Sequence, residues 1–587
     1  MKPLPPLDDN PCRPRHFKPD PCSPAPLAAP ARQSLETSHT RLLITAGLFC
    51  LAFLVIGLRL IEVSAFHSGD PRLARHDLPT APTPHRADIV DRNGVLLATT
   101  LETPSLYADP KELAAANVDA HAAARQLVHV LPDLKVDEVY AKLTSPRGFV
   151  WLKRQLTPRQ EYEVNRLGIP GLQFEDEAKR VYPKGNLTAD VVGFVGLDNK
   201  GFAGVERGMD SVLRGRNTPL ELSIDVRLQY ILHDALAQQV SAFTATGGAG
   251  IIMDVRTGEI LAMVSLPDFD PNDPGKATPD ELFDRATLGT YEMGSVFKIF
   301  NTAIALDTHA STMTSSYDAT NPIRIGGFTI PDDHAQRRWL TVPEIFMYSS
   351  NIGSAKMALD IGTDRQREYV KRFGLLSEPK GFQMRELGTP LYPANWKPIN
   401  TMTIAFGQGM SVSELQLATG AAAVIDGGIM HPATLLKHPA GYPVAGERVV
   451  SQTTSEDMRR LLRLVVERGT GKFAEAPGYV VGGKTGTAEK VSGKRYAIHS
   501  LFSSFLGVFP MNDPRYLVLI SVDEPHGNAK SFGYATGGWV AAPAVKQVVE
   551  RMAPLVGIPP VDENSPEIRR ALMVDVPTPP GRKLASN

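Results

Sequence analysis

The sequence predicts an α+β protein with a single N-terminal membrane helix, an elongated α+β domain and then a larger α+β domain. Three observations support this. Residues 42–58 form an uncharged apolar run, residues 86–220 mix strand-like with helical pieces, and beyond residue 247 strand-like segments flank a mostly helical stretch. Strands on both sides of a helical stretch favour one sheet packed by helices. With about 100–200 residues per domain, 587 residues allow several domains.

Composition excludes several classes of protein. The 62 basic and 63 acidic residues leave a net charge of −1, so the positive surface of a nucleic-acid partner is not expected. The three cysteines are Cys12, Cys22 and Cys50, so nothing later in the chain can form a disulfide or a thiolate metal site. The 14 histidines show no H-E-x-x-H pairing. We therefore expect no metal and no cofactor.

The N-terminal region divides into a tail and an apolar segment. Residues 1–41 are rich in proline without apolar periodicity, which predicts a disordered tail. Residues 42–61 can nearly cross a hydrocarbon core about 30 Å thick, since a helix rises about 1.5 Å per residue. A cleavable signal peptide is the rival interpretation, because residues 63–65 (Val-Ser-Ala) resemble a cleavage site. The long tail and Arg59 favour an uncleaved transmembrane helix, and the flanking charges do not settle its orientation.

Residues 62–220 are predicted to form a juxtamembrane linker and a non-catalytic domain. Residues 87–97 read as strand, Asn-Gly turn and strand, and 110–165 contain Ala-rich and Leu-rich helical stretches. A second domain is predicted over 221–556. It begins with a helix that Ser223 or Asp225 can cap and that runs through residue 236.

The second domain continues with a hairpin, 251–253 and 260–264, around Gly258, which suits a positive φ. Helices are expected from about 295 to 470. The remaining predicted elements are strands at 479–485, 501–509 and 516–522 and a helix at 543–555. Residues 557–587 are again proline-rich and predict a flexible C-terminal tail.

One segment allows a nucleotide-binding interpretation. Residues 478–485 fit the pattern G-x-x-x-x-G-K-[ST], and 517–524 resemble an apolar strand ending in a magnesium-binding acid. A phosphate-binding loop needs a helix that starts at the Lys-Thr pair. Gly486 and Thr487 follow instead, which suit a strand or turn better than a helix. A P-loop nucleotide hydrolase is therefore a remote alternative.

The same lysine also completes a set of three motifs for serine acyl transfer. Ser295 and Lys298 are i and i+3 at the start of a helical stretch, so they share one face. A lysine there can act as a base if burial or a second cation lowers its pKa, and Lys484 is a candidate for that cation. Ser349 and Asn351 add a hydroxyl and an amide before another helical stretch.

Each motif alone has an ordinary structural explanation. Ser295 suits a helix N-cap, Asn351 a cap or turn, and Lys484 a solvated strand. A further S-x-x-K match, residues 377–380, contains Pro379 and reads as chance, because proline interrupts a helix. The three motifs in this order are much more specific than any one of them.

With these motifs the chain resembles the class B penicillin-binding proteins, most closely the division-specific transpeptidases (FtsI type). The resemblance covers roughly residues 86–555. Its further motifs are Arg86 to Gly94, Arg180-Val181-Tyr182-Pro183, Gly204 to Gly208, Leu213-Arg214-Gly215, Phe406 to Gly409, Gly469-Thr470-Gly471 and Gly482 to Ala488. In two departures, Ala87 replaces a usual glycine and Met293 a frequent proline, and neither removes a reacting group. For the larger domain the resemblance implies an antiparallel sheet packed between helical regions.

The resemblance implies D,D-transpeptidation of peptidoglycan stem peptides ending in D-Ala-D-Ala, with β-lactams as inhibitors. Ser295 would be the nucleophile, Lys298 its base, Ser349 a proton relay and Asn351 a group that holds the substrate amide. Lys484, Thr485 and Thr487 would bind the terminal carboxylate, backbone N–H groups of Ser295 and Thr487 would form the oxyanion hole, and Gly486 would let the substrate backbone lie against the strand. Strict alternation, however, puts Lys484 and Gly486 on one face and both threonines on the other.

The resemblance also implies a place in the cell. The tail would be cytoplasmic, 42–61 would cross the inner membrane, 62–220 would form a pedestal (dimerisation-like) domain, and the penicillin-binding transpeptidase domain of 221–556 would be periplasmic at the division septum. A SEDS-type membrane glycosyltransferase and other division proteins would be partners. An elongation-type transpeptidase, a D,D-carboxypeptidase and a non-catalytic divisome scaffold are the alternatives.

Overall fold

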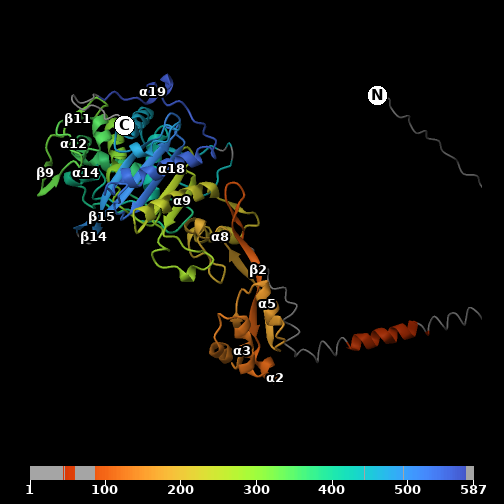
Figure 1. Ribbon diagram of the computed structural model, residues 1–587. Coiled ribbons are helices and arrows are strands. Elements are labelled where there is room, and N and C mark those ends of the chain that lie inside the picture. Colours follow the sequence, from red (N-terminus) through yellow and green to blue (C-terminus); the bar gives the residue numbers. More distant parts are fainter. Residues whose placement is uncertain are drawn as a thin grey trace, which may run out of the picture. The chain divides into compact units, whose positions relative to one another are not determined.

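The computed structural model describes residues 44, 46–59, 86–439, 441, 443–492 and 495–576 (Figure 1). It divides into two compact units, Met1–Pro82 and Thr83–Asn587. In the first unit, residues 46–59 are helical and apolar side chains such as Leu48 and Phe53 are exposed. The predicted tail and the ends of the predicted 42–61 helix lie outside the described residues. Among the helices that are described, none has the length and apolar character needed to cross a membrane.

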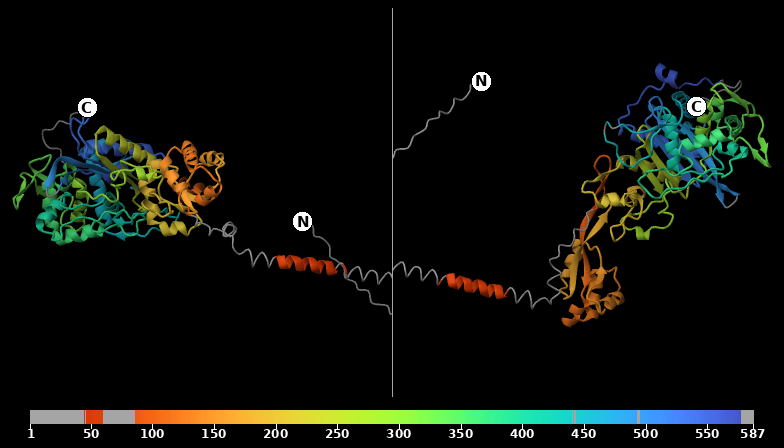
Figure 2. Two further views of the ribbon diagram at one scale, coloured as in Figure 1. Left: turned by 90° about the horizontal axis from the view of Figure 1, so that it is seen from below. Right: turned by 180° about the vertical axis from the view of Figure 1, so that it is seen from behind.

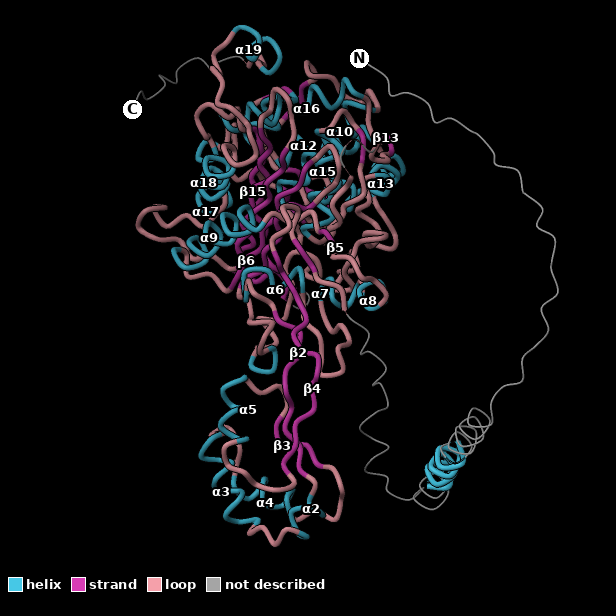
Figure 3. The backbone as a smooth tube through the Cα atoms, turned by 90° about the vertical axis from the view of Figure 1, so that its right-hand side faces the viewer, coloured by secondary structure: helices cyan, strands magenta, loops and turns pink. Residues whose placement is uncertain are grey.

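The second unit begins with a five-stranded sheet, called here the pedestal sheet. Its strands are β1 (Ile89–Val90), β2 (Leu96–Ala108), β3 (Val150–Lys153), β4 (Leu172–Val181) and β5 (Leu220–Glu221). The order is β3-β2-β1-β5, and β4 pairs antiparallel with β2 over the whole of its length. Figure 3 shows β2 and β4 side by side as the long axis of this sheet. The predicted strand, Asn-Gly turn and strand are present as β1, the turn at Asn93-Gly94 and β2.

Four helices cover the end of the pedestal sheet where β2 pairs with β3. They are α2 (Pro110–Ala115), α3 (Ala120–Val130), α4 (Val136–Leu143) and α5 (Pro158–Asn165). Asp109, Asp119 and Thr157 begin α2, α3 and α5 by accepting hydrogen bonds from backbone N–H groups. Buried leucine, valine and alanine side chains from these helices and from β2 and β3 form a small core of their own. The two views in Figure 2 show these helices (orange) gathered together.

A buried ionic network joins the other end of the pedestal sheet. Glu206, on α7 (Gly204–Gly208), receives both the Arg86 and the Arg180 guanidinium groups, the latter at 2.7 Å. Arg86 also binds Asp210, on α8 (Asp210–Arg214), at 2.7 Å, and Arg180 donates to the Ala87 carbonyl at 2.8 Å. Two cations around one buried carboxylate tie segments that are far apart in sequence into one body. Three motifs of the family resemblance supply this network.

The remainder of the second unit is built on a five-stranded antiparallel sheet of order β14-β15-β16-β6-β7. Its strands are β14 (Gly482–Ser492), β15 (Arg495–Phe509), β16 (Tyr516–Asp523), β6 (Gly247–Asp254) and β7 (Ile260–Leu266). The predicted 251–264 hairpin is β6 and β7, with Gly258 at φ +74°. The strand predicted at 479–485 is β14, which starts at Gly482 and not at residue 479, because the chain turns through Gly478 and Val480 at positive φ.

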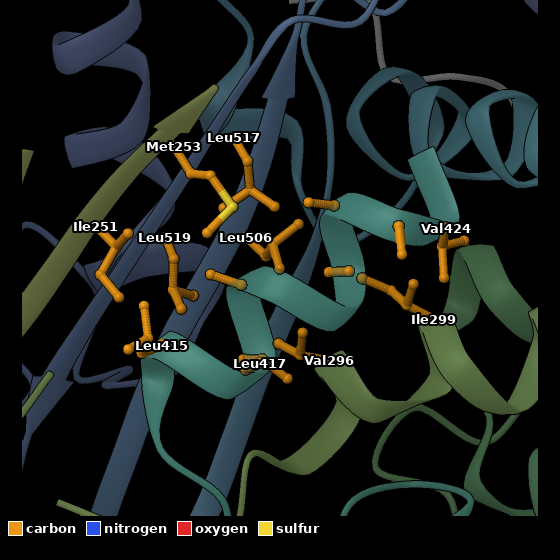
Figure 4. Packing of buried hydrophobic residues seen from close by; sticks show 14 of the residues in the cluster. Ile251, Met253, Val296, Ile299, Leu415, Leu417, Val424, Leu506, Leu517 and Leu519 are labelled. Carbon is orange, nitrogen blue, oxygen red and sulfur yellow. The ribbon is translucent and has the colours of Figure 1, made fainter. Parts of the chain in front are cut away.

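Helices cover both faces of this sheet. One face packs on α15 (Glu414–Ile425) and on the segment of η3 (Gly294–Phe297) and α10 (Lys298–Asp307), as Figure 4 shows for Leu415, Val296 and Ile299. The other face packs on α9 (Val226–Ala242), capped by Asp225, and on α18 (Ala542–Met552). Alternate residues of β6, β15 and β16 divide between these two cores, as expected for a strand buried on both sides.

The other elements surround the α10 side of the sheet or connect its strands. The helices are α6 (Ala189–Val192), η1 (Gly185–Thr188), η2 (Pro274–Lys276), α11 (Val342–Tyr348), α12 (Asn351–Ile361), α13 (Thr363–Arg372), α14 (Pro398–Ile404), α16 (Gln452–Arg468), η4 (Lys472–Ala474) and α17 (Gly537–Val540). The short strands are β8 (Ser316–Asp318), β9 (Ile323–Ile325), β10 (Phe328–Ile330), β11 (Trp339–Thr341), β12 (Ile429–Met430) and β13 (Glu447–Arg448).

The prediction of a loose tail from residue 557 is wrong for residues 557–576. Ser565 caps a further helix, α19 (Pro566–Leu572), and Leu572 and Val576 are buried. Proline-rich composition misled the prediction, because Pro566 occupies the first helical turn, where its missing N–H costs nothing. Residues 577–587 lie outside the described part of the chain.

Replacing Glu206 by glutamine should destabilise the protein by about 3 kcal/mol or more, because two buried guanidinium groups would lose their shared counter-charge. The free energy of unfolding, measured in urea, tests this. Glu102→Gln is the matched control, since Glu102 is exposed on β2 and its replacement should change stability by less than about 0.5 kcal/mol. Equal effects of the two changes would contradict the assigned role of Glu206.

Candidate active site

The serine and lysine of the first motif are brought together by a change of helix type. Ser295 lies in the 3-10 turn η3, and Lys298 is the first residue of α10. In a 3-10 turn the side chains of i and i+3 eclipse each other. The Lys298 Nζ atom therefore lies 2.8 Å from the Ser295 Oγ atom. The sequence placed Ser295 at the start of a helical stretch. The structure places it in a 3-10 turn, and the α-helix begins three residues later at Lys298.

Four oxygen atoms surround the Lys298 amine. Besides the Ser295 hydroxyl, these are the Ser349 carbonyl at 2.7 Å, the Ser349 hydroxyl at 3.1 Å and Asn351 Oδ1 at 2.7 Å. The carbonyl and amide oxygens can only accept, so they take two N–H groups of the amine. In the neutral amine this leaves the lone pair for a hydroxyl proton. The geometry thus places a base at the Ser295 hydroxyl.

Burial makes the neutral amine accessible near physiological pH. Lys298 is fully buried, and this desolvation lowers its pKa to about 7, against the opposing influence of Asp333 and Asp332. Lys484 is also fully buried, and its pKa is lowered well below the ordinary lysine range, first by desolvation and then by the charge of Lys298. Burial, and not the charge of Lys484, is therefore the dominant cause for Lys298.

The second motif sits where two helices meet. Ser349 is the C-cap of α11 and has the left-handed backbone conformation, with φ +58°. A non-glycine residue held there stores about 1–3 kcal/mol of strain, which the surrounding contacts must offset. The turn directs the Ser349 hydroxyl between the two lysines, 3.1 Å from Lys298 Nζ and 2.9 Å from Lys484 Nζ.

The loop after β10 holds the start of α12 in place. Asp332 accepts hydrogen bonds from the Ser350 hydroxyl at 2.7 Å and from the Ile352 backbone N–H at 2.9 Å. Asn351 donates from Nδ2 to the Pro331 carbonyl at 3.1 Å, which orients its Oδ1 toward Lys298. One N–H of this amide group remains for a ligand.

The third motif lies on β14, an edge strand of the sheet, and it keeps strict alternation. Lys484 and Gly486 face η3 and α11, where Lys484 reaches Ser349. Thr485 and Thr487 face the other way, where their hydroxyls contact Thr470 Oγ1 at 2.8 Å and the Gly537 N–H at 3.1 Å. The side chains thus leave the strand on alternate sides, but the Lys484 Nζ atom still lies 3.5 Å from Thr485 Oγ1, so the lysine and this threonine can act on one group.

Gly486 lies closely packed against the segment around η3. A Cβ atom there would lie 2.4 Å from Ser504 Oγ and 2.8 Å from the Met293 carbonyl, both inside the protein. The missing side chain makes room for η3, while the predicted approach of a substrate backbone at Gly486 stays a prediction. Gly294, at φ +53°, likewise lets η3 approach the strand, since its Cβ would lie 2.4 Å from the Thr487 carbonyl. The backbones at Ser295 and Thr487 are thereby held close together.

All eight residues predicted from the sequence belong to the segments that meet here: Ser295, Lys298, Ser349, Asn351, Lys484, Thr485, Gly486 and Thr487. The sequence predicted no role for four further residues near the site, Asp332, Asp333, Thr470 and Phe346. The ring centroid of Phe346 lies 6.0 Å from Lys484 Nζ. Thr470 belongs to Gly469-Thr470-Gly471, one of the motifs of the family resemblance, whereas the other three residues belong to none of those motifs. Lys484-Thr485 lies within a strand, so the helix that a nucleotide site requires is missing there. Among the described residues, no cluster of His, Cys, Asp or Glu could hold a metal ion.

Family comparison matches the chain in two parts. Residues 248–550 match the penicillin-binding protein transpeptidase domain, and residues 81–232 match the penicillin-binding protein dimerisation domain. The chain is 43% identical over 486 residues to the "Probable peptidoglycan D,D-transpeptidase FtsI" of Caulobacter vibrioides, covering 81% of this chain and 82% of that protein. It is 30% identical to the peptidoglycan D,D-transpeptidase FtsI of Escherichia coli, covering 81% and 84%.

Solved structures share the fold. Penicillin-binding protein 3 of Mycobacterium tuberculosis, in complex with ampicillin, superposes with a TM-score of 0.65 at 24% identity, covering 82% of this chain and 98% of that one. The isolated transpeptidase domain of penicillin-binding protein 3 from Burkholderia pseudomallei gives a TM-score of 0.52 at 35% identity, covering 58% of this chain and 98% of that domain.

Replacing Asp332 by asparagine should lower stability by about 1–2 kcal/mol, because one of its two acceptor positions at the start of α12 becomes a donor. Unfolding in urea measures this. Asp364→Asn is the comparison, since Asp364 is an exposed carboxylate in the first turn of α13 and its loss should cost less than about 1 kcal/mol. An equal loss at both positions would mean that Asp332 acts only through its charge.

Proposed function

Because this chain belongs to the class B penicillin-binding proteins of the FtsI type and is a peptidoglycan D,D-transpeptidase, we propose that Ser295 is its acylated nucleophile. The observation that carries this proposal is the buried Lys298 amine 2.8 Å from Ser295 Oγ. Ser295 Oγ attacks the carbonyl between the two terminal D-Ala residues while its proton passes to Lys298 Nζ. The C–N bond breaks, D-Ala leaves and an ester remains on Ser295.

Ser349 completes the proton path. Its hydroxyl lies within hydrogen-bond distance of both lysine amines, which supports a relay from Lys298 to the leaving amine nitrogen. In the second half of the reaction an amine of a neighbouring stem peptide attacks the ester. Its proton returns along the same groups, Ser295 Oγ is released, and the new amide is the crosslink.

The edge position of β14 supports binding of the stem peptide as an added strand. The N–H groups of Ser295 and Thr487 would receive the developing oxyanion, an interaction worth about 3 kcal/mol in comparable enzymes. Lys484, Thr485 and Thr487 would bind the terminal carboxylate, and the free N–H of Asn351 would bind the substrate amide. β-Lactams, one of which is bound in the related Mycobacterium tuberculosis structure, would acylate the same serine.

The cellular role is crosslinking of septal peptidoglycan in cell division, supported by the relatives that bear the name FtsI. A SEDS-type glycosyltransferase and other division proteins are the proposed partners, because the enzyme crosslinks glycan that another protein must polymerise. Localisation of a tagged protein distinguishes this role, at mid-cell, from an elongation role, along the side wall. Product analysis distinguishes crosslinking from carboxypeptidase release of D-Ala alone.

Residues 42–61 would anchor the enzyme in the inner membrane, with the N-terminus cytoplasmic and the catalytic domain periplasmic. The uncharged run over 42–58 and the location of the substrate outside the cytoplasm support this topology. Protease treatment of spheroplasts should digest the catalytic domain and leave an N-terminal tag intact. Protection of the catalytic domain would contradict the proposed orientation.

Fluorescent penicillin should label the purified protein, and Ser295→Ala should abolish labelling, because the ester cannot form without that hydroxyl. Ser377→Ala is the control, since Ser377 begins the other S-x-x-K match and lies outside the site. It should label like the wild type. Labelling of the Ser295→Ala protein, or no labelling of the wild type, would contradict the serine mechanism.

The acylation rate constant should rise with pH through about 7 and then level off, because Lys298 acts as a base only when neutral and burial lowers its pKa to about 7. Stopped-flow or quenched penicillin labelling from pH 5.5 to 9 measures this. Asp333→Asn should move the midpoint to lower pH, since the Asp333 charge favours protonated Lys298. A midpoint near the ordinary lysine pKa would contradict this assignment.

A further inference from the structure

Residues 561–576, called here the C-terminal strap, cross the outer side of α16. At the first end, the Val561 N–H donates to the Gly478 carbonyl at 2.8 Å, and the Gly478 N–H donates to Glu563 at 2.5 Å. Glu563 also accepts from Arg463, a buried residue of α16, at 2.9 Å. In the middle, Arg460 donates to the Ala571 carbonyl at 3.0 Å. The strap is thus fixed at several points.

The contact between Glu563 and Arg463 lies next to β14, the strand that carries Lys484. The Arg463 guanidinium donates to the Val481 carbonyl at 2.8 Å, and Val481 directly precedes β14. Lys484 follows only three residues later. Glu563 shares the neutralisation of Arg463 with Glu475 and Glu467, and of these three carboxylates it alone links this guanidinium to the strap.

The contact made by Val576 lies next to the turn at Ser349. Val576 is buried against Met347 and Leu464, and Val574 packs at the edge of the same small cluster with Tyr348. Met347 and Tyr348 are the last residues of α11 and directly precede Ser349. The strained turn at Ser349 therefore depends partly on a contact that the far end of the chain supplies.

We propose that the C-terminal strap is a positioning element of the active site, which fixes the Ser349 turn against the Lys484 strand through Val576 and Glu563. The inference rests on the proposed acylation of Ser295, whose relay needs Ser349 Oγ within 2.9 Å of Lys484 Nζ and 3.1 Å of Lys298 Nζ. A misplacement of about 1 Å in such a site can reduce the rate by about 100-fold. The strap touches neither the nucleophile nor its base.

Two variants of the full chain test the contact at Val576 and the contact at Glu563 separately. Val574→Ala with Val576→Ala empties the cluster beside Met347, and Glu563→Gln removes the negative charge that faces Arg463 while keeping an acceptor for the Gly478 N–H. Each should slow penicillin acylation by about tenfold at a temperature well below unfolding. Glu563→Asp should recover part of the rate. Glu567→Gln, an exposed change on α19 of the strap, is the matched control and should react like the wild type.

The pH profile separates positioning from stability alone. If the turn loosens, water reaches Lys298, which also faces Lys484, Asp332 and Asp333, and the midpoint of acylation should rise. If the strap only stabilises the fold, the substitutions should lower the melting temperature and leave both the acylation rate and its pH midpoint unchanged in the folded protein. That result would overturn the proposal. Absence of acylation in the wild type would instead refute the serine mechanism itself, so the two failures are distinguishable.

Discussion

Removal of the Lys298 amine from water is the constraint on which the rest of the site depends. An ammonium in this position would be costly to bury, and its four oxygen neighbours compensate only in part. The balance keeps the amine close to its neutral form, so that it can accept a proton from Ser295. The left-handed turn at Ser349, the orientation of Asn351 and the 3-10 start of α10 each serve to place one of those oxygens.

The sheet makes this arrangement possible by separating two functions. Its α10 face carries the two lysines and the hydroxyls of Ser295 and Ser349, whereas its α17 face ties the threonines of β14 to Thr470 and Gly537. Between them, the edge of β14 remains the natural place for a substrate backbone. Side chains from three distant parts of the sequence therefore meet without any of them being carried on a long loop.

Sequence patterns predicted the elements whose signals are local. The Gly258 hairpin, the Asn-Gly turn before β2 and the Asp225 cap all follow from residue types at short spacing, and the motif order predicted a set of residues that the structure brings together. What could not be predicted depends on tertiary contacts. Asp332 acts on α12 across a loop, Gly486 makes room for η3, and the strap packs where α16 supplies Arg463 and Leu464. Proline content alone suggested disorder in that segment.

Where η3 meets its neighbours, backbone contacts backbone with no side chain between. A Cβ atom at Gly407 would lie 2.1 Å from the Gly294 carbonyl, and one at Gly294 would lie 2.4 Å from the Thr487 carbonyl. No larger residue fits at either glycine without moving the nucleophile. The position of Ser295 is therefore set by the main chain itself, at Gly294, Gly407 and Thr487, and not by side chains that substitution could reshape.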